Sequence, residues 1–243
     1  MKIKIINPNT TWNMTLEIEK VAKKFARPDT EITAVSPDSG PVSIESMYDE
    51  ALAQPGVLEE IKKGLKDGFD GFVLACFGDP ALYAAREVSD IPVIGIAEAA
   101  MLMACMLGNK FSIITVLKRI TPMMEEVVMK YGLKSRCASV RATDLSVLEL
   151  EEDIDKTKEI LLEEGRKAIN EDGAEVLLLG CAGMAGLDTE LEKELGVPVI
   201  DGTVAAVKFL EGIHDYGKKT SKILAFKPPE KKLIKGYPKI LQP

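Results

Sequence analysis

The sequence predicts an α/β fold of two pseudo-symmetric lobes, each a mainly parallel sheet flanked by helices, with the active site in the cleft between them. Short apolar runs of strand length alternate with stretches of helical period, and the runs lack the strict polar alternation of one-sided sheets. Residues 73–80 also have a second copy at residues 176–184. In each copy an apolar run ends in a cysteine, Cys76 or Cys181, and a glycine follows. The chain is therefore predicted to be a tandem pair of related halves.

Two further matches support the duplication. An Asp-Gly pair precedes each cysteine at the same distance, at residues 67–68 and 172–173. Downstream, Ile91–Gly95 is matched by Val197–Asp201 with a shift of a single residue, and an alanine-rich helical run follows both. The predicted organisation is an N-terminal lobe carrying Cys76 at residues 1–96 with 203–216, a C-terminal lobe carrying Cys181 at residues 97–202, and an extended C-terminal tail at residues 217–243.

The elements of the first half follow from periodicity and turn chemistry. Asn7–Thr11 forms a turn after the first strand and supplies N-cap candidates for the next helix. Asp79-Pro80 fits the N-cap and first-turn preferences of a helix over Ala81–Val88, which places Cys76 in the bend just before a helix start. The predicted strands are Lys2–Ile6, Glu31–Val35 and a run ending at Cys76, and the other predicted helices run through Leu16 to Phe25 and from near Met47 through Leu65.

The second half repeats this alternation. Charged and apolar residues of helical period fill Leu150–Ile169, which predicts one long helix. In the tail, Pro228, Pro229 and Pro238 exclude a continuous helix, and the segment is expected to pack over a lobe or over a neighbouring subunit. The other predicted strands are Phe111–Thr115, Cys137–Arg141, Ala174–Leu179 and Pro198–Ile200, and the other helices cover Arg119–Lys130, begin near Asp188 and cover Val204–Ile213.

Charge and hydropathy exclude several classes of partner. The net charge is −7 over 243 residues, which argues against a nucleic-acid surface or an anionic membrane surface. No apolar run approaches the length of a membrane span, and the first residues lead directly into a strand rather than a secretory signal. We therefore expect a cytoplasmic protein with a small-molecule substrate, no nucleic acid and no membrane as partners.

Cysteine and histidine usage narrows the chemistry. The 4 cysteines show no C-x-x-C spacing, so the sequence contains neither a zinc signature nor a disulfide framework. The single histidine, His214, lies late in a helical run and is expected at the surface, which disfavours a Cys-His or Ser-His nucleophile. A metal site is not expected.

The positions of Cys76 and Cys181 predict acid/base chemistry at one carbon. Ligands of parallel α/β sheets bind beyond the carboxyl ends of the strands, so a pseudo-two-fold arrangement would put these two sulfurs on opposite walls of one cleft. One thiolate would remove a proton next to a carbonyl, and the opposing thiol would deliver another to the far face. The sequence predicts that a helix start and backbone donors lower the thiol pKa from about 8.5. No metal or redox cofactor is required.

A cysteine after a buried strand is more often a small core residue than a catalyst. Because a cysteine recurs at the equivalent position in both halves, a catalytic role is preferred for Cys76 and Cys181. Cys105 and Cys137 have neither the glycine bend nor a counterpart, so both are interpreted as packing residues. Gly78 and Gly183 would let backbone amides approach the substrate and stabilise the developing enolate oxygen.

Several motifs together resemble the hydantoin racemase branch of the aspartate/glutamate/hydantoin racemase superfamily over nearly the whole chain. They are Asn7–Thr11, Gly40–Glu45, Cys76–Pro80 with Ala84–Glu87, Gly180–Met184, and Lys219–Lys222 with Pro228-Pro229. One departure is Val116, which stands where the family often has a second threonine after Thr115 and so bears on the pocket wall.

The resemblance implies cofactor-independent racemisation of 5-substituted hydantoins, or of the related ureide allantoin, by a homo-oligomer. It implies Cys76 and Cys181 as the acid/base pair. A hydantoin ring is neutral, and the motifs offer polar and backbone groups without an arginine clamp. The residues expected to bind the substrate are Asn7, Asn9, Thr10, Val42, Ser43, Phe77, Gly78, Thr115, Ala182 and Gly183.

Two alternatives stay open on the sequence. The same cleft could serve another reaction of the superfamily, such as amino-acid racemisation, cis-trans isomerisation or decarboxylation. A protein of a different class, a non-catalytic two-lobe sensor closing over a small molecule, would leave the paired cysteines unexplained. The sequence does not identify the 5-substituent.

Overall fold

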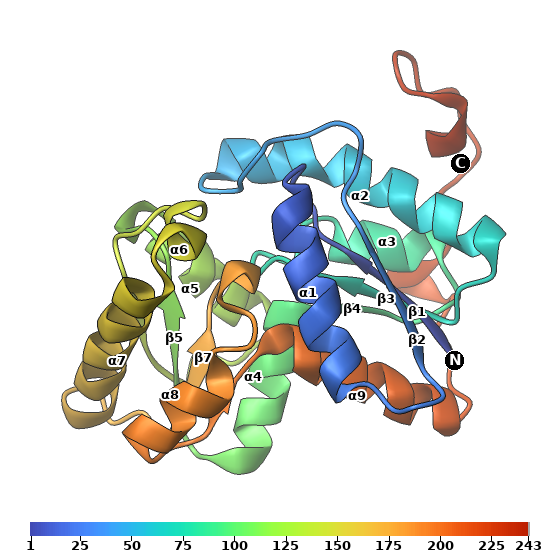
Figure 1. Cartoon of the computed structure of the whole chain (residues 1–243). Helices are drawn as coiled ribbons and strands as arrows, with labels where there is room; N and C mark the ends of the chain where they lie inside the picture. Colours follow the sequence, from blue (N-terminus) through green and yellow to red (C-terminus); the bar gives the residue numbers. More distant parts are fainter. Residues whose placement is uncertain (243) are drawn as a thin grey trace.

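The computed structural model describes residues 1–242 and contains two four-stranded parallel sheets flanked by helices. The strand order is β2-β1-β3-β4 in one sheet and β6-β5-β7-β8 in the other, so the two halves share one topology (Figure 1). This confirms the predicted fold class. The strands are β1 Lys2–Ile6, β2 Glu31–Val35, β3 Gly71–Leu74, β4 Val93–Gly95, β5 Phe111–Thr115, β6 Cys137–Ala142, β7 Val176–Leu179 and β8 Val199–Ile200.

Helices fill the connections between the parallel strands. They are α1 Trp12–Phe25, α2 Met47–Asp67, α3 Leu82–Val88, α4 Ile96–Leu107, α5 Thr121–Lys130, α6 Glu149–Glu152, α7 Ile154–Asn170, α8 Asp188–Leu195 and α9 Gly202–Asp215, with 3-10 turns η1 Lys118–Ile120, η2 Ala182–Met184, η3 Leu224–Phe226 and η4 Lys239–Leu241. None of the helices within residues 1–242 combines the length and apolar character needed to cross a bilayer.

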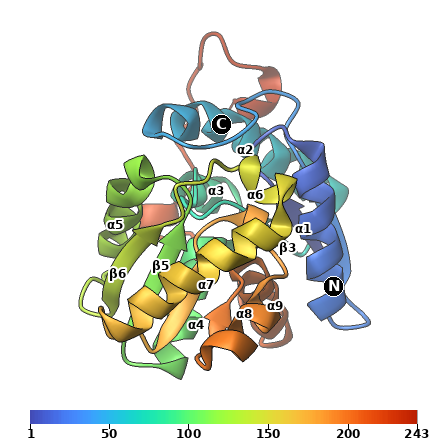
Figure 2. The same ribbon diagram turned by 60° about the vertical axis from the view of Figure 1, so that its left-hand side comes forward.

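The longest helix, α2, has well-defined ends. Ser46 accepts a hydrogen bond from the Asp49 amide at 3.2 Å, and Gly68 ends the helix in the left-handed conformation with φ +77°. The N-terminal part of α2 reaches towards α5 and α6 of the second half (Figure 1, Figure 2). This helix therefore belongs to the first half by sequence and borders the second half in space.

One predicted helix is divided in two. The periodic run Leu150–Ile169 contains a break at Asp153, whose backbone is extended and whose carboxylate accepts from the Lys156 amide at 3.1 Å. Asp153 thus caps α7 and separates it from the single turn of α6. The helical period continued through this residue because a cap changes the chain direction without interrupting the apolar spacing.

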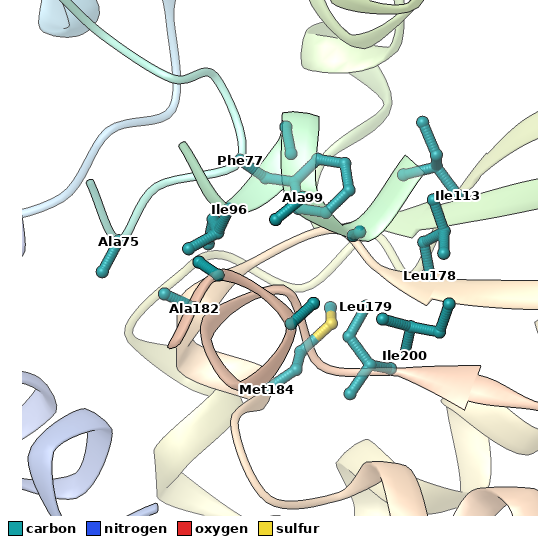
Figure 3. Packing of buried hydrophobic residues seen from close by; sticks show 14 of the residues in the cluster. Ala75, Phe77, Ile96, Ala99, Ile113, Leu178, Leu179, Ala182, Met184 and Ile200 are labelled. Carbon is teal, nitrogen blue, oxygen red and sulfur yellow. The ribbon is translucent and has the colours of Figure 1, made fainter. Parts of the chain in front are cut away.

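A continuous core joins the halves. The largest cluster of buried apolar side chains includes Ile3 and Val73 from the first sheet and Ile113 and Leu178 from the second. Figure 3 shows Ala75 and Phe77, which follow β3, on the same cluster as Ala182 and Met184, which follow β7. The segments that carry the two cysteines are therefore packed against each other through buried apolar contacts.

The helix α9 packs against β3 and α1 of the first half as well as against α4. Since α4 falls in the predicted C-terminal lobe, α9 contacts both halves, and the grouping of residues 203–216 with the N-terminal lobe stays a prediction. The tail packs over helices of that lobe: η3 lies on α3, with the rings of Tyr83 and Phe226 edge to face at 5.7 Å, and η4 lies on α2. Pro243, the last residue of the predicted tail, lies outside the described residues.

Candidate active site

Cys76 and Cys181 line the same cavity. Each lies two residues beyond a strand that is third in its sheet, Cys76 after β3 and Cys181 after β7. Both cysteines are partly buried, and no disulfide forms among the four cysteines of the described chain. The two halves thus present one thiol each to a common space.

The two cysteine segments share their local hydrogen bonding. The Gly183 amide donates to the Cys181 sulfur at 3.4 Å, and the Gly78 amide donates to the Cys76 sulfur. The Cys76 carbonyl accepts from the Asp79 amide at 3.0 Å, and the Cys181 carbonyl accepts from the Met184 amide at 3.1 Å. In both halves the glycine two residues after the cysteine places an N–H beside the sulfur.

The pKa of Cys76 differs from the expectation. Burial raises the pKa of its thiol, the Gly78 amide acts against this, and the negative charges of Glu50, Cys181 and Asp79 raise it further. The predicted helix Ala81–Val88 is present as α3 Leu82–Val88, so Cys76 does precede a helix start, and the backbone amide that reaches its sulfur is that of Gly78. The prediction of a lowered pKa at Cys76 is therefore wrong: desolvation outweighs the backbone donor. Since Cys181 adds to the rise at Cys76, the pair disfavours two simultaneous thiolates.

The capping role predicted for Asp79 is also wrong. Its carboxylate accepts from the Ala97 amide at 3.1 Å and the Glu98 amide at 2.9 Å, so it caps α4 rather than α3. It accepts a third hydrogen bond from the Tyr131 hydroxyl at 2.6 Å. Local spacing suggested the nearer helix, whereas the fold brings the start of α4 against the cysteine segment.

The cavity wall is largely apolar. Its residues are Asn7, Asn9, Met14, Ile44, Ala75, Cys76, Phe77, Gly78, Val116, Ile120, Met123, Met124, Val147, Gly180, Cys181 and Ala182. Among these described lining residues there is no lysine, arginine or histidine. A ligand with a full carboxylate would meet no cationic side chain on this wall, whereas a neutral ring would be matched by apolar surface and amides.

The two asparagines supply the polar side of the wall. The Asn7 side-chain NH₂ donates to the side-chain oxygen Oδ1 of Asn9 and to the Thr15 hydroxyl at 2.9 Å each. Asn9 Oδ1 also accepts from the Thr11 amide at 2.9 Å. The Asn9 side-chain NH₂ contacts only the Met14 sulfur at 3.4 Å among the described residues, which is a weak acceptor. This network fixes both amides and leaves the Asn9 NH₂ as a donor for a ligand.

The structure brings seven of the predicted site residues to the cavity, and the remaining five lie outside its wall. Those on the wall are Asn7, Asn9, Cys76, Phe77, Gly78, Cys181 and Ala182. Those off the wall are Thr10, Val42, Ser43, Thr115 and Gly183. A catalytic or substrate-binding role stays a prediction for all twelve residues, since the cavity lining shows only their position.

Thr10 and Val42 hold a loop rather than line the cavity. The Thr10 amide donates to the Pro41 carbonyl at 3.0 Å, and the Thr11 hydroxyl donates to the Val42 carbonyl at 2.7 Å. These bonds fix the loop that carries Ile44 to the cavity wall. Thr115 is fully buried, and its hydroxyl has no partner within residues 1–242. Its neighbour Val116, singled out as a departure from the family, is on the wall.

Sequence reasoning missed the wall residues that come from elsewhere in the chain. Met14 comes from α1, Ile120 precedes α5, Met123 and Met124 lie on α5, and Val147 lies before α6. In the sequence these residues look like ordinary core positions, because each fits the apolar periodicity of the element that it belongs to or precedes. The remaining predictions for side chains away from the cavity are met: Cys105 and Cys137 are partly buried against the core, and His214 is exposed.

A sequence profile described as Asp/Glu/Hydantoin racemase matches residues 3–210, so the chain belongs to this family. It is 59% identical over 236 residues to a hydantoin racemase of Pseudomonas sp. strain NS671, covering 97% of this chain and 95% of that protein. Its structure is similar to that of an allantoin racemase from Klebsiella pneumoniae, with TM-score 0.95 and 48% identity over 97% of this chain and 96% of the other.

A second solved structure gives the same result. An allantoin racemase from Pseudomonas fluorescens superposes with TM-score 0.94 at 39% identity, covering 97% of this chain and 100% of the other. Arylmalonate decarboxylase, at TM-score 0.68 and 17% identity, shares the fold. The family recognised from the cysteine motifs is confirmed, and the chain is a racemase of the isomerase class.

Proposed function

We propose that this protein racemises 5-monosubstituted hydantoins or allantoin without a cofactor, using Cys76 and Cys181 as a two-base pair at C5. The observation that carries the proposal is the common cavity, which receives one cysteine from the same position of each half. The relatives named hydantoin racemase and allantoin racemase support the substrate class. The apolar wall without a cationic side chain among its described residues supports a neutral ring.

The reaction needs no change in the number of protons on the enzyme. A thiolate on one wall forms an S–H bond as the C5–H bond breaks, and the electron pair passes to the adjacent carbonyl oxygen. The thiol on the other wall then gives its proton to the far face of C5. The enzyme ends with thiol and thiolate exchanged, ready for the opposite enantiomer.

The electrostatics of the pair suit this cycle. Mutual repulsion in a desolvated site favours a state with one thiolate and one thiol. Burial makes the Cys76 thiolate scarcer and more basic. We therefore expect kcat/KM to rise with pH as the first thiol loses its proton. The N–H groups of Gly78 and Gly183 stabilise whichever sulfur carries the charge.

The decisive experiment replaces each cysteine separately. Cys76→Ala and Cys181→Ala are each expected to lower racemisation of both enantiomers at least about 1,000-fold, because either proton transfer is then missing. Chiral chromatography would follow allantoin, 5-benzylhydantoin, 5-isopropylhydantoin, aspartate and glutamate, and NMR in D₂O would follow exchange at C5. Cys105→Ala is the matched control and should keep full activity, since Cys105 lies off the cavity wall. Full turnover by either single-cysteine variant would reject the two-base mechanism.

The homo-oligomeric state and the cytoplasmic location belong to the same proposal. Light scattering coupled to size-exclusion chromatography tests the first, and cell fractionation tests the second. The monomer mass of 26.5 kDa gives the reference for the former measurement.

A further inference from the structure

A groove opens beside the cysteine cavity. It has a volume of about 410 Å³ and shares Gly78 and Met123 with the cavity wall. Its sides are one face of α2 and one face of α5, so it lies between a helix of each half. The lining residues are Met47, Glu50, Ala51, Gln54, Gly78, Met123, Glu126, Val127 and Lys130.

The cysteine cavity itself is small. Its free volume is about 40 Å³, on a scale where one water needs about 10–15 Å³. A ring held with C5 between the two sulfurs would fill this space, so a group attached to C5 would have to extend out of it. The groove reached past Gly78 has ten times the volume and adjoins the Cys76 side of the cavity.

Glu50 lies at the junction of the two spaces. One of its carboxylate oxygens is 3.0 Å from the point that a Cβ on Gly78 would occupy, and its charge acts on Cys76. The absence of a side chain at Gly78 therefore lets the carboxylate stand against the backbone of the cysteine segment. A group next to C5 would come within hydrogen-bonding reach of this carboxylate.

Burial raises the pKa of the Glu50 carboxyl, the charge of Lys130 lowers this pKa, and the charge of Glu126 raises it. Within residues 1–242 the Glu50 side chain has no hydrogen bond or ion pair, although it is partly buried. The nearest cation of the groove, Lys130, lies over the ring of Tyr83 at 4.3 Å from its centroid. The groove wall combines apolar side chains with three further polar ones, Gln54, Glu126 and Lys130. Gln54 and Glu126 also offer acceptor oxygens to the groove, and Glu50 is the acceptor that lies against Gly78 of the cysteine segment.

We propose that this groove holds the 5-substituent of the substrate and that Glu50 accepts hydrogen bonds from N–H groups on it. The substrate class would then be hydantoins whose substituent carries N–H donors, such as the ureido group of allantoin, in preference to hydantoins with purely apolar substituents. This inference rests on the proposed racemase function, which it refines.

The preference follows from desolvation. An apolar substituent entering the groove removes water from the Glu50 carboxylate and returns no hydrogen bond, whereas a ureido group replaces the lost water contacts. A site built to pair with a polar group rejects analogues that lack it far more strongly than an apolar pocket rejects an added polar group. Glu50 is therefore a specificity-determining residue.

The test compares two substrates in the same variants. Glu50→Met keeps the side-chain length and removes the acceptor, and Glu50→Gln keeps one acceptor oxygen and removes the charge. The measured quantity is the ratio of kcat/KM for allantoin to kcat/KM for 5-isopropylhydantoin. Glu50 also acts on Cys76, but that effect is common to both substrates and cancels in the ratio.

We expect E50M to lower this ratio about 10- to 100-fold and E50Q to lower it by a smaller factor, about 3- to 10-fold. Glu125→Met on the neighbouring α5 is the matched control: Glu125 is exposed and does not line the groove, so the ratio should stay at the wild-type value. If E50M does not fold, E50Q, which preserves shape, gives the same reading at smaller amplitude.

Two outcomes would overturn the inference. They are an unchanged ratio in a folded Glu50 variant, including the case of an equal loss for both substrates, and a wild-type protein that prefers 5-isopropylhydantoin. The last result would leave the racemase function standing, because turnover of any hydantoin establishes it. A wild-type protein that racemises no hydantoin would instead remove the proposed function itself.

Discussion

Each half places a carboxylate at the start of the helix that follows its fourth strand, but the two carboxylates come from different parts of the sequence. In the second half Asp201 is the N-cap of α9 and accepts from the amides of Thr203 at 2.7 Å and Val204 at 3.3 Å. In the first half the corresponding N-cap of α4 is Gly95. There the carboxylate of Asp79, from the cysteine segment, accepts from the second and third amides of the helix.

Steric detail shows that the two arrangements are alternatives. A Cβ built on Gly95 would overlap the Asp79 carboxylate, so the side chain of residue 79 occupies the volume that a side chain at residue 95 would need. Asp79 reaches this place with a left-handed backbone, at φ +48°. The duplicated halves have therefore kept the position of a charge while exchanging the residue that provides it.

In both halves the carboxylate anchors the segment that follows the cysteine. In the second half Asp201 also accepts from the Gly186 amide at 3.0 Å, which ties the segment after Cys181 to the start of α9. In the first half Asp79 is itself part of the segment after Cys76, and its hydrogen bonds from the Ala97 and Glu98 amides tie that segment to the start of α4. Both halves thus anchor the cysteine segment to a helix N-terminus, where a carboxylate is favoured by the amides and the helix dipole.

The largest effect is expected from moving the carboxylate. Asp79→Gly leaves two helix amides and the Tyr131 hydroxyl without their acceptor and should lower the free energy of unfolding by about 3 kcal/mol. Gly95→Asp should cost at least as much, since its side chain has no room beside Asp79. The double variant reproduces the arrangement of the second half and is expected to lie within about 1 kcal/mol of the wild type. Urea denaturation measures all three.

Asp201→Gly is the control for this exchange. It removes a carboxylate that the N-cap residue of α9 itself supplies, so it should destabilise by an amount similar to that for Asp79→Gly. Additive losses in the Asp79, Gly95 double variant would show that the two positions are not interchangeable and that the comparison fails.

A second effect depends on pH. Burial raises the pKa of Asp79 to about 6, against the opposing hydrogen bonds from Tyr131, Glu98 and Ala97. The pKa of Asp79 in the folded state lies above the unfolded value of about 3.9, so the folded protein favours the protonated carboxyl. The resulting stabilisation is fully present below the unfolded pKa, and it is lost as pH rises through the folded pKa of about 6. Relative to Asp79→Asn, the wild type should lose about 2 to 3 kcal/mol between pH 4 and pH 7.

Denaturation of both proteins across this range would check the sign as well as the size. Burial also raises the pKa of Asp201, and its contribution is present in both proteins and cancels in the difference. Stability curves that run parallel for wild type and Asp79→Asn would refute the assignment.

The capping exchange also marks the limit of what the sequence could predict. Strands such as Lys2–Ile6 and Phe111–Thr115 were predicted with the bounds that the structure shows, because their signals lie in adjacent residues. The matched cysteines predicted a shared cavity, since each follows a parallel strand at the same position in its half and ligands bind beyond the carboxyl ends of such strands. The cap of α4 by Asp79 spans 18 residues and depends on packing, so local spacing assigned it to α3 instead.

The candidate site divides in the same way. Asn7, Cys76 and Cys181 were predicted because they follow strand ends within recognisable motifs. Glu50 and Met123 were not, because each belongs to a helix with ordinary amphipathic spacing, and only the approach of α2 to α5 brings them to the groove. The direction of the Cys76 pKa was missed for a related reason: desolvation is a property of the packed site, and the sequence shows only the nearby donor.

The smallest of these effects concerns the side-chain hydrogen bond to Asp79, for which Asp201 has no counterpart among the described residues. The Tyr131 hydroxyl, at the end of α5, donates to Asp79 at 2.6 Å, whereas the three donors to Asp201 are all backbone amides. Tyr131→Phe removes this link between the halves and should lower the free energy of unfolding by about 1 kcal/mol, while the two amides of α4 still satisfy most of the carboxylate.

The same change should move the pH dependence, which a packing defect would not. The Tyr131 bond favours the charged form of Asp79, so its loss raises the pKa of that carboxyl further and shifts the pH-dependent fall in stability to higher pH. Tyr83→Phe is the matched control, because that ring is 40% exposed and the Tyr83 hydroxyl makes no hydrogen bond to Asp79. If Tyr131→Phe lowers stability equally at pH 4 and pH 7, the hydroxyl acts through packing alone and the asymmetry between the two caps has no electrostatic consequence.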